Sequence, residues 1–308
     1  MKIVFFGTSV FAAEVLKHLQ QQKDIEILAV VTRPDRPKGR SLSLSPPPVK
    51  EVSKAPVYQP KKASTDEFAN ILKKLHADLF VVVAYGEIIK ANILQIPKLG
   101  CVNIHASLLP KYRGAAPIHR ALMNGEKETG ITIIEMVLQM DAGDMLEVVK
   151  TPVPDDMTFG ELEKKLCELA CIAIMNTIHH FQKGTVIKTP QDPNLVTFAA
   201  KLTPEDEIID WNKPAKTIHN LIRAFSPRPG AWCKIKIGDE EKRLKIKRSL
   251  VIQEKSGPPK TFLSYGKEGW IVACGEQALQ LLEVQLEGKN TLSTQDFLKG
   301  IHQKISLI

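Results

Sequence analysis

The first hundred residues contain short, continuous runs of apolar residues, and these runs constrain the fold more than any other feature. The runs do not alternate with polar residues, so each is expected to form a strand that is buried on both faces. Segments with apolar residues at helical spacing, such as Phe11–Gln21 and Thr65–Leu75, lie between several of them. This pattern predicts an α/β domain with a doubly wound, mostly parallel sheet. The expected strands are Lys2–Phe6, Ile25–Thr32, Val57–Tyr58, Leu79–Val83 and Cys101–His105.

A sheet of this kind predicts where function should be sought. Ligands bind beyond the carboxyl ends of the strands in doubly wound folds. The segments to inspect therefore follow Phe6, Thr32, Val83 and Ile104. The Gly7-Thr8 turn after the first strand is not part of a GxGxxG motif, so a dinucleotide site is not supported.

The second half of the chain has a different pattern. Two more strands are expected around a turn that contains Asp141, and a long helix is expected over Phe159–Phe181. A polar, proline-rich stretch over 190–207 is typical of a linker. Beyond it, short alternating runs predict a small antiparallel barrel of the OB type. We therefore expect a Rossmann-like domain over 1–189, a linker over 190–207 and an OB-like domain over 208–308.

Charge is distributed unevenly. The net charge is +8, and residues 201–308 hold 18 Lys and Arg against 13 Asp and Glu, so the smaller part carries most of the excess. Such asymmetry favours a polyanionic partner, although a merely soluble basic surface has the same composition.

Other global features of the sequence argue against several classes of protein. No run of 18 or more apolar residues occurs, so no membrane span is expected, and the apolar start is typical of a strand rather than a signal peptide. The number of cysteines, five, is odd and they include no CxxC pair, which argues against a disulfide framework or a metal site. We expect a cytoplasmic protein without a metal.

A polar pair lies at the end of one buried run. Asn103 and His105 are two residues apart in an expected strand, so their side chains should face the same side. A buried core histidine is the usual explanation for such a residue, but the turn-rich stretch Ser107–Gly114 follows directly, where a ligand is expected, and weakens that explanation. Asp141 could be an ordinary turn residue, and spacing alone does not bring it to His105.

Two basic segments could hold phosphates. The first, Arg33–Arg40, is expected to form a loop after a strand and has four cations with one acid. The second, Lys234–Arg248, has seven Lys and Arg, and the alternation around Lys245 and Lys247 predicts one basic and one apolar face. Each segment could also be a solvated surface without a partner.

These residues together resemble a known family. Asn103-x-His105, the string Ser107-Leu-Leu-Pro-x-x-Arg-Gly114 and Asp141 resemble the formyltetrahydrofolate-dependent formyltransferases. The longer strings are similar to the methionyl-tRNA formyltransferase family, in order and across both expected domains. They include FFGTSVFAA, TRPDRPKGR, VVVAYGEI, NIHASLLPKYRGAAPIHRAL, KLTPEDEIIDW, IRAFSPRPGAW and LEGKNTLSTQDFLKG.

The resemblance implies an activity and a set of roles. The expected reaction moves a formyl group from 10-formyltetrahydrofolate to methionyl initiator tRNA, with the protein acting as a monomer. Asn103 and His105 would stabilise the oxyanion, with Asp141 as charge partner or proton acceptor. Folate contacts are implied for Val83, Tyr85, Gly86, Ser107, Leu108, Leu109 and Pro110. Contacts with tRNA are implied for Arg33, Arg36, Lys38, Arg40, Lys245, Lys247 and Arg248.

Two alternatives remain open at this point. A formyltransferase or formyl-folate hydrolase that acts on a small molecule would carry the same Asn–His–Asp motif. A nucleic-acid-binding protein that kept an inactive formyltransferase fold would carry the same basic segments.

Overall fold

The computed structural model describes residues 1–38, 43–266 and 269–308. Its chain forms two compact units that interleave along the sequence. The expected domain bounds of 1–189, 190–207 and 208–308 stay a prediction. Unit 1 comprises Met1–Gly114, Thr129–Thr151 and Glu163–Phe198, and unit 2 comprises Ala115–Glu128, Pro152–Leu162 and Ala199–Ile308.

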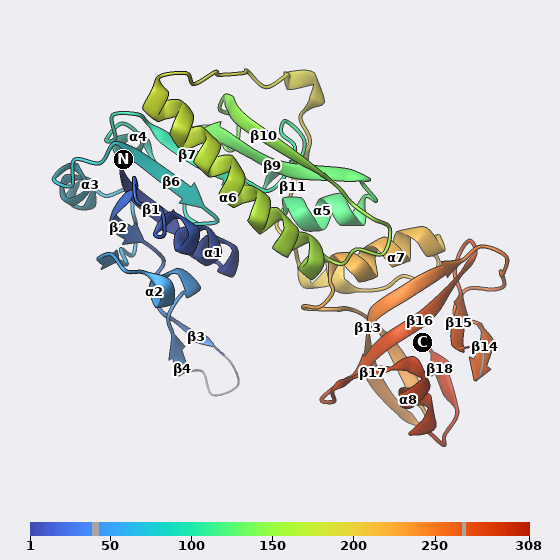
Figure 1. The fold of residues 1–308 in the computed structure, drawn as a ribbon. Coiled ribbons are helices and arrows are strands. Elements are labelled where there is room, and N and C mark those ends of the chain that lie inside the picture. Colours follow the sequence, from blue (N-terminus) through green and yellow to red (C-terminus); the bar gives the residue numbers. More distant parts are fainter. Residues whose placement is uncertain (39–42, 267–268) are drawn as a thin grey trace. The chain divides into compact units, whose positions relative to one another are not determined.

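Unit 1 is built on a seven-stranded sheet in the order β10-β9-β7-β6-β1-β2-β5 (Figure 1). The pairs from β7 to β5 are parallel and β7 pairs with β9 antiparallel, which confirms the mostly parallel α/β sheet. The strands are β1 (Lys2–Gly7), β2 (Glu26–Val31), β5 (Val57–Tyr58), β6 (Leu79–Val83), β7 (Cys101–His105), β9 (Glu128–Glu135) and β10 (Met145–Pro152).

The sheet of unit 1 is buried on both faces, as its apolar runs predict. Val4, Phe6 and Phe80 share one core cluster with Phe68 and Leu72. Alternate residues of the same strands point the other way and are also fully buried. The helices include α1 (Val10–Leu19), α2 (Pro48–Val52), α3 (Asp66–Lys73), α4 (Ala91–Leu94) and α6 (Phe159–Lys183).

The basic segment after β2 differs from expectation. Its start is a strand, β3 (Arg36–Lys38), which pairs antiparallel with β4 (Ser43–Ser45). A loop was expected here because the segment is polar and contains two prolines. Arg40 lies outside the described residues.

Unit 2 contains a curled, antiparallel half-barrel in the order β14-β15-β16-β13-β12-β18, with β17 on β16. This confirms the expected OB-like part. Its strands are β12 (Ala231–Ile237), β13 (Glu240–Ile252), β14 (Phe262–Gly266), β15 (Gly269–Ala273), β16 (Ala278–Leu286), β17 (Thr291–Ser293) and β18 (Ile305–Leu307). Its helices include α5 (Pro117–Met123), α7 (Ala215–Ala224) and α8 (Thr294–Lys299).

Strand β13 follows the predicted alternation as far as Lys247. Leu244 and Ile246 are fully buried. Lys245 and Lys247 share the other face, because each donates to the carbonyl of Pro229. Lys247 is nevertheless only 6% exposed, since Pro227 and Pro229 both pack against its ammonium group. The register of β13 against β16 shifts between Ile246 and Arg248, and Arg248 lies on the same side as the two lysines.

Within the described residues, no helix combines the length and apolar character that crossing a membrane requires.

Candidate functional site

Three polar side chains that are far apart in the sequence meet in unit 1. Asn103 and His105 lie on β7, and Asp141 lies in the turn between β9 and β10. The Nδ2 atom of Asn103 donates to Oδ1 of Asp141 over 3.3 Å. The backbone N–H of Gly114 donates to Oδ2 of Asp141 over 2.8 Å. The sequence-predicted trio is thus brought together, and the loop after His105 helps to hold its carboxylate.

The His105 ring is oriented by the same loop. Its Nε2 lies 2.9 Å from the carbonyl oxygen of Tyr112, which only accepts, so Nε2 carries a proton and donates. Nδ1 lies 3.7 Å from Oδ2 of Asp141, a charge contact rather than a hydrogen bond. Because His105 is 5% exposed and the Asp141 side chain 13%, water screens this contact little.

Two residues that the sequence analysis missed hold the Asp141 turn. Gln191 donates from Nε2 to the carbonyl oxygens of Asp141 and Gly143, each over 2.8 Å. Arg113 donates from Nε and Nη2 to Oε1 of Gln191 over 3.1 and 2.8 Å. Asp141 has φ +50°, a left-handed conformation that needs such support in a residue other than glycine. Gln191 falls in the expected linker, where no pattern distinguished it.

The Ser107–Pro110 loop is held by hydrogen bonds with strand β9 and with the residue that follows the loop. Thr132 on β9 donates from Oγ1 to the carbonyl of Ser107 over 2.7 Å and accepts from the N–H of Leu109 over 3.1 Å. Ser107 is fully buried, and its hydroxyl donates to the carbonyl of Lys111 over 2.7 Å. Leu108 is partly exposed, whereas Leu109 is buried. The loop is therefore preorganised by polar contacts that leave little of its backbone free.

The loop after β6 is held from three sides. The Thr8 hydroxyl donates to the carbonyl of Tyr85 over 2.8 Å, and Arg33 donates from Nη1 to the carbonyl of Gly86 over 3.0 Å. The Tyr85 hydroxyl donates to Glu87 over 3.2 Å, and burial together with the Glu87 charge raises the pKa of Tyr85. Val83 and Tyr85 have buried side chains, so a ligand beside this loop would meet mainly backbone.

The first residues of the basic segment of unit 1 are held by hydrogen bonds and an ion pair, not left as a free loop. Gln59 donates to the carbonyl of Arg33 over 2.8 Å and to Asp35 over 2.7 Å, and Lys50 pairs with Asp35 at 2.9 Å. The hydrogen bonds from Gln59 and Lys50 lower the pKa of Asp35. Arg36 is exposed, and Lys38 ends β3.

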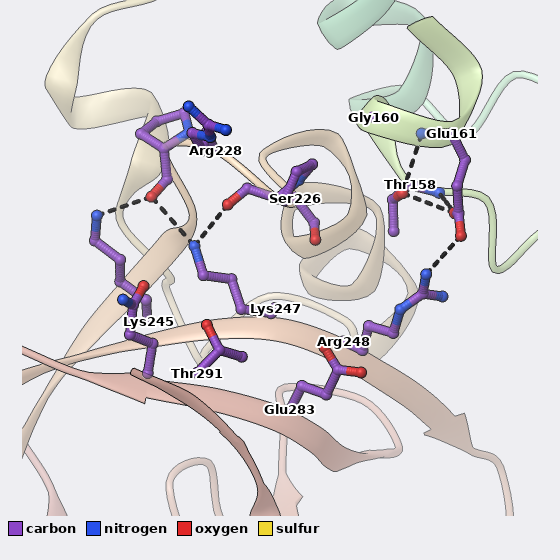
Figure 2. A pocket seen from close by; sticks show the side chains of 13 residues that line it. Thr158, Gly160, Glu161, Ser226, Arg228, Lys245, Lys247, Arg248, Glu283 and Thr291 are labelled. Carbon is purple, nitrogen blue, oxygen red and sulfur yellow. Dashed lines mark hydrogen bonds and ion pairs between the residues drawn. The ribbon is translucent and has the colours of Figure 1, made fainter. Parts of the chain in front are cut away.

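A pocket of about 820 Å³ in unit 2 is lined by three of the basic residues of β13, Lys245, Lys247 and Arg248 (Figure 2). Lys245 and Lys247 each donate to the carbonyl of Pro229, over 2.8 and 3.4 Å. Arg248 instead donates to Glu161 over 2.5 Å. The predicted cations are thus brought together, but each already has a protein partner.

Two family models match the chain. The formyl transferase model covers residues 1–178, and the model of the formyl transferase C-terminal domain covers residues 201–302. A methionyl-tRNA formyltransferase from Protochlamydia amoebophila is 50% identical over 98% of this chain and 95% of its own. A methionyl-tRNA formyltransferase from Chlamydia pneumoniae is 42% identical over 99% of this chain and 96% of its own.

Solved structures show the same fold at low identity. An N-formyltransferase from Helicobacter canadensis, in complex with folinic acid and dTDP-3-aminofucose, has a TM-score of 0.66 at 19% identity and covers 91% of this chain and 99% of its own. HypX from Aquifex aeolicus, in complex with tetrahydrofolic acid, has a TM-score of 0.64 at 17% identity and covers 99% of this chain and 48% of its own. Both family models and the near full-length relatives lead to one assignment: the chain belongs to the formyl transferase family and, within it, to the methionyl-tRNA formyltransferases.

Proposed function

We propose that the chain transfers the formyl group of 10-formyltetrahydrofolate to the α-amino group of methionyl initiator tRNA, as a cytoplasmic monomer. The observation that carries this proposal is the convergence of Asn103, His105 and Asp141 in a member of this family. The names of the near full-length relatives supply the acceptor, and the family supplies the folate donor.

The chemistry requires stabilisation of an oxyanion. The methionyl amine attacks the formyl carbon, and negative charge develops on the formyl oxygen in a tetrahedral intermediate. Asn103 uses one amide hydrogen on Asp141, which leaves the other for this oxygen. His105 already donates from Nε2 to Tyr112, so its donor for the substrate would be Nδ1–H of the imidazolium form. Asp141 is the negative charge beside that ring nitrogen.

Proton transfer completes the exchange. The attacking amine loses a proton as the new C–N bond forms, and the N10 nitrogen gains one as the old C–N bond breaks. Asp141 accepts the first proton, directly or through water, and returns it toward the leaving nitrogen. No nucleophilic side chain is needed, because the substrate amine is itself the nucleophile.

The folate donor would bind beside two loops of unit 1. The loop Val83–Gly86 would contact the donor through backbone groups, because its large side chains are buried. The loop Ser107–Pro110 would present the partly exposed Leu108. Both loops follow neighbouring parallel strands, β6 and β7, at the edge where doubly wound sheets bind ligands.

The tRNA would be bound by the basic residues of both units. Arg36, Lys38 and Arg40 would serve the acceptor end, next to Arg33, whose guanidinium is held on the carbonyl of Gly86. Residues 208–308, with Lys245, Lys247 and Arg248, would serve the tRNA backbone. Phosphates dominate such binding and make it dependent on salt.

The experiment that tests the function offers the purified protein 10-formyltetrahydrofolate and four separate acceptors. These are initiator methionyl-tRNA, elongator methionyl-tRNA, glycinamide ribonucleotide and a nucleotide-linked amino sugar. Rapid formylation of initiator methionyl-tRNA alone is the expected result. Formylation of a small molecule but not of tRNA would assign the chain to the other kind of formyltransferase.

A further inference from the structure

We propose that the pocket of unit 2 holds one backbone phosphate of the RNA, with Arg228 as its ligand and with Lys245 and Lys247 as fixed charges behind it. This inference rests on the proposed function for the presence of an RNA substrate. It assigns to Arg228 a role that the basic pattern of β13 does not reveal, and it makes Lys245 and Lys247 fixed charges behind the phosphate rather than its direct ligands.

The pocket has two chemically different ends (Figure 2). At one end, Arg248 donates to Glu161 and also pairs in register with Glu283 across β13 and β16. At the other end lie Arg228, Lys245 and Lys247, and both carboxylates that line the pocket belong to the Arg248 end. One end is therefore neutralised, and the other keeps its positive charge.

The positive end is built into the fold. Lys247 is 6% exposed, and its Nζ donates to the carbonyl oxygens of Pro227 and Pro229 over 2.8 and 3.4 Å. Gly230 has φ +97°, and a Cβ atom there would collide with Nζ of Lys247. Carbonyl oxygens immobilise an ammonium group but carry no full negative charge, so the cation is held without being neutralised.

The three cations act on one another. Burial, followed by the charges of Lys245 and Arg228, lowers the pKa of Lys247. Repulsion between these neighbouring positive charges raises the free energy of the pocket when no anion is bound, and a bound anion reduces that repulsion. An anion therefore gains more at this end than at an isolated surface lysine.

Arg228 is the group placed to reach a ligand. It lies between Pro227 and Pro229, the residues whose carbonyls hold the two lysines, and it is exposed. Within the described ranges 1–38, 43–266 and 269–308, its guanidinium has neither a hydrogen bond nor an ion pair. A guanidinium binds phosphate through two parallel N–H donors, which suits a phosphodiester better than a single ammonium does.

The test compares Arg228→Gln with a matched variant of the full chain. Lys304→Gln removes an exposed cation that lies outside the pocket. Binding of uncharged initiator tRNA is measured across a series of salt concentrations. Arg228→Gln should lower the slope of log K against log salt by about 1, the value for one phosphate contact. Lys304→Gln should change the slope by much less.

A second arm identifies the anion. RNA is displaced from the wild type with sodium phosphate and with sodium chloride at matched ionic strength. Phosphate should displace RNA more effectively from the wild type, and this excess should vanish in Arg228→Gln. Equal displacement by both salts, or a slope unchanged in Arg228→Gln, overturns the proposal. The binding assay needs no formyl transfer, so its result is independent of whether the proposed activity is found.

Discussion

Arg33 donates a hydrogen bond from Nη1 to the carbonyl oxygen of Gly86, 3.0 Å away. This contact joins the first residue of the basic segment to the loop proposed to meet the folate. The guanidinium also lies against Gly86, where an added Cβ would be 3.5 Å from Nη1. Arg33 is therefore placed to position the β6 loop rather than to bind a phosphate freely.

The variant Arg33→Ala should consequently weaken use of the folate donor. Loss of one hydrogen bond of about 1 kcal/mol corresponds to a roughly fivefold rise in KM for 10-formyltetrahydrofolate. Arg36→Ala, at an exposed residue of the same segment, is the control and should change only the KM for tRNA. Steady-state kinetics with each substrate varied in turn separates the two, and an identical folate KM in both variants would refute the positioning role.

Gln191 should act on turnover without touching substrate. The variant Gln191→Ala leaves the carbonyls of Asp141 and Gly143 and the side chain of Arg113 without this partner. We expect kcat to fall at least tenfold, because the Asp141 carboxylate loses its fixed position, and stability to fall by about 1–3 kcal/mol. Measuring kcat beside urea unfolding checks both parts. Normal kcat in a variant that is destabilised as expected would show that the turn needs no such support.

Acid should destabilise unit 2 through His119. This ring stacks on Phe159 at 3.9 Å between centroids, and burial, with a smaller effect of Arg120, lowers its pKa to about 4. Between pH 6.5 and about 4, the unfolded chain therefore binds a proton that the folded chain does not. Stability should fall as pH falls through this window.

The measurement is thermal unfolding of His119→Phe and wild type between pH 7 and about 4. The wild type should lose more stability on acidification than His119→Phe does. His302→Gln, at an exposed position, serves as the control and should follow the wild type. Parallel pH profiles for the wild type and His119→Phe would contradict the assignment.

The parts of the fold that could be predicted are those where burial leaves a mark in the sequence. Runs such as Leu79–Val83 are apolar at every position because both faces of the strand are covered. The hairpin of β3 and β4 leaves no such mark, because its strands are short and polar. Lys245 and Lys247 share a face as the alternation predicts, but the burial of Lys247 against Pro227 and Pro229 leaves no mark in the sequence of β13.

In the candidate site, too, some of the geometry could be predicted from the sequence and some could not. Asn103 and His105 share a strand face, so their proximity follows from spacing alone. Asp141 lies 38 residues from its partner Asn103 in the sequence, and Gln191 lies 50 residues from its partner Asp141. Only tertiary folding brings these residues together. For Asp141, the family resemblance supplied what spacing could not. For Gln191, neither source supplied a signal.

The most direct test of the account is the turnover of Asn103→Ala and His105→Ala in formylation of initiator methionyl-tRNA. Asn70→Ala, an exposed asparagine in α3, is the matched control. Loss of one oxyanion donor typically lowers kcat by about a hundredfold to a thousandfold, so each site variant should lose at least that much while it keeps its affinity for tRNA. Near-normal kcat in either site variant would contradict the claim that these two side chains stabilise the oxyanion.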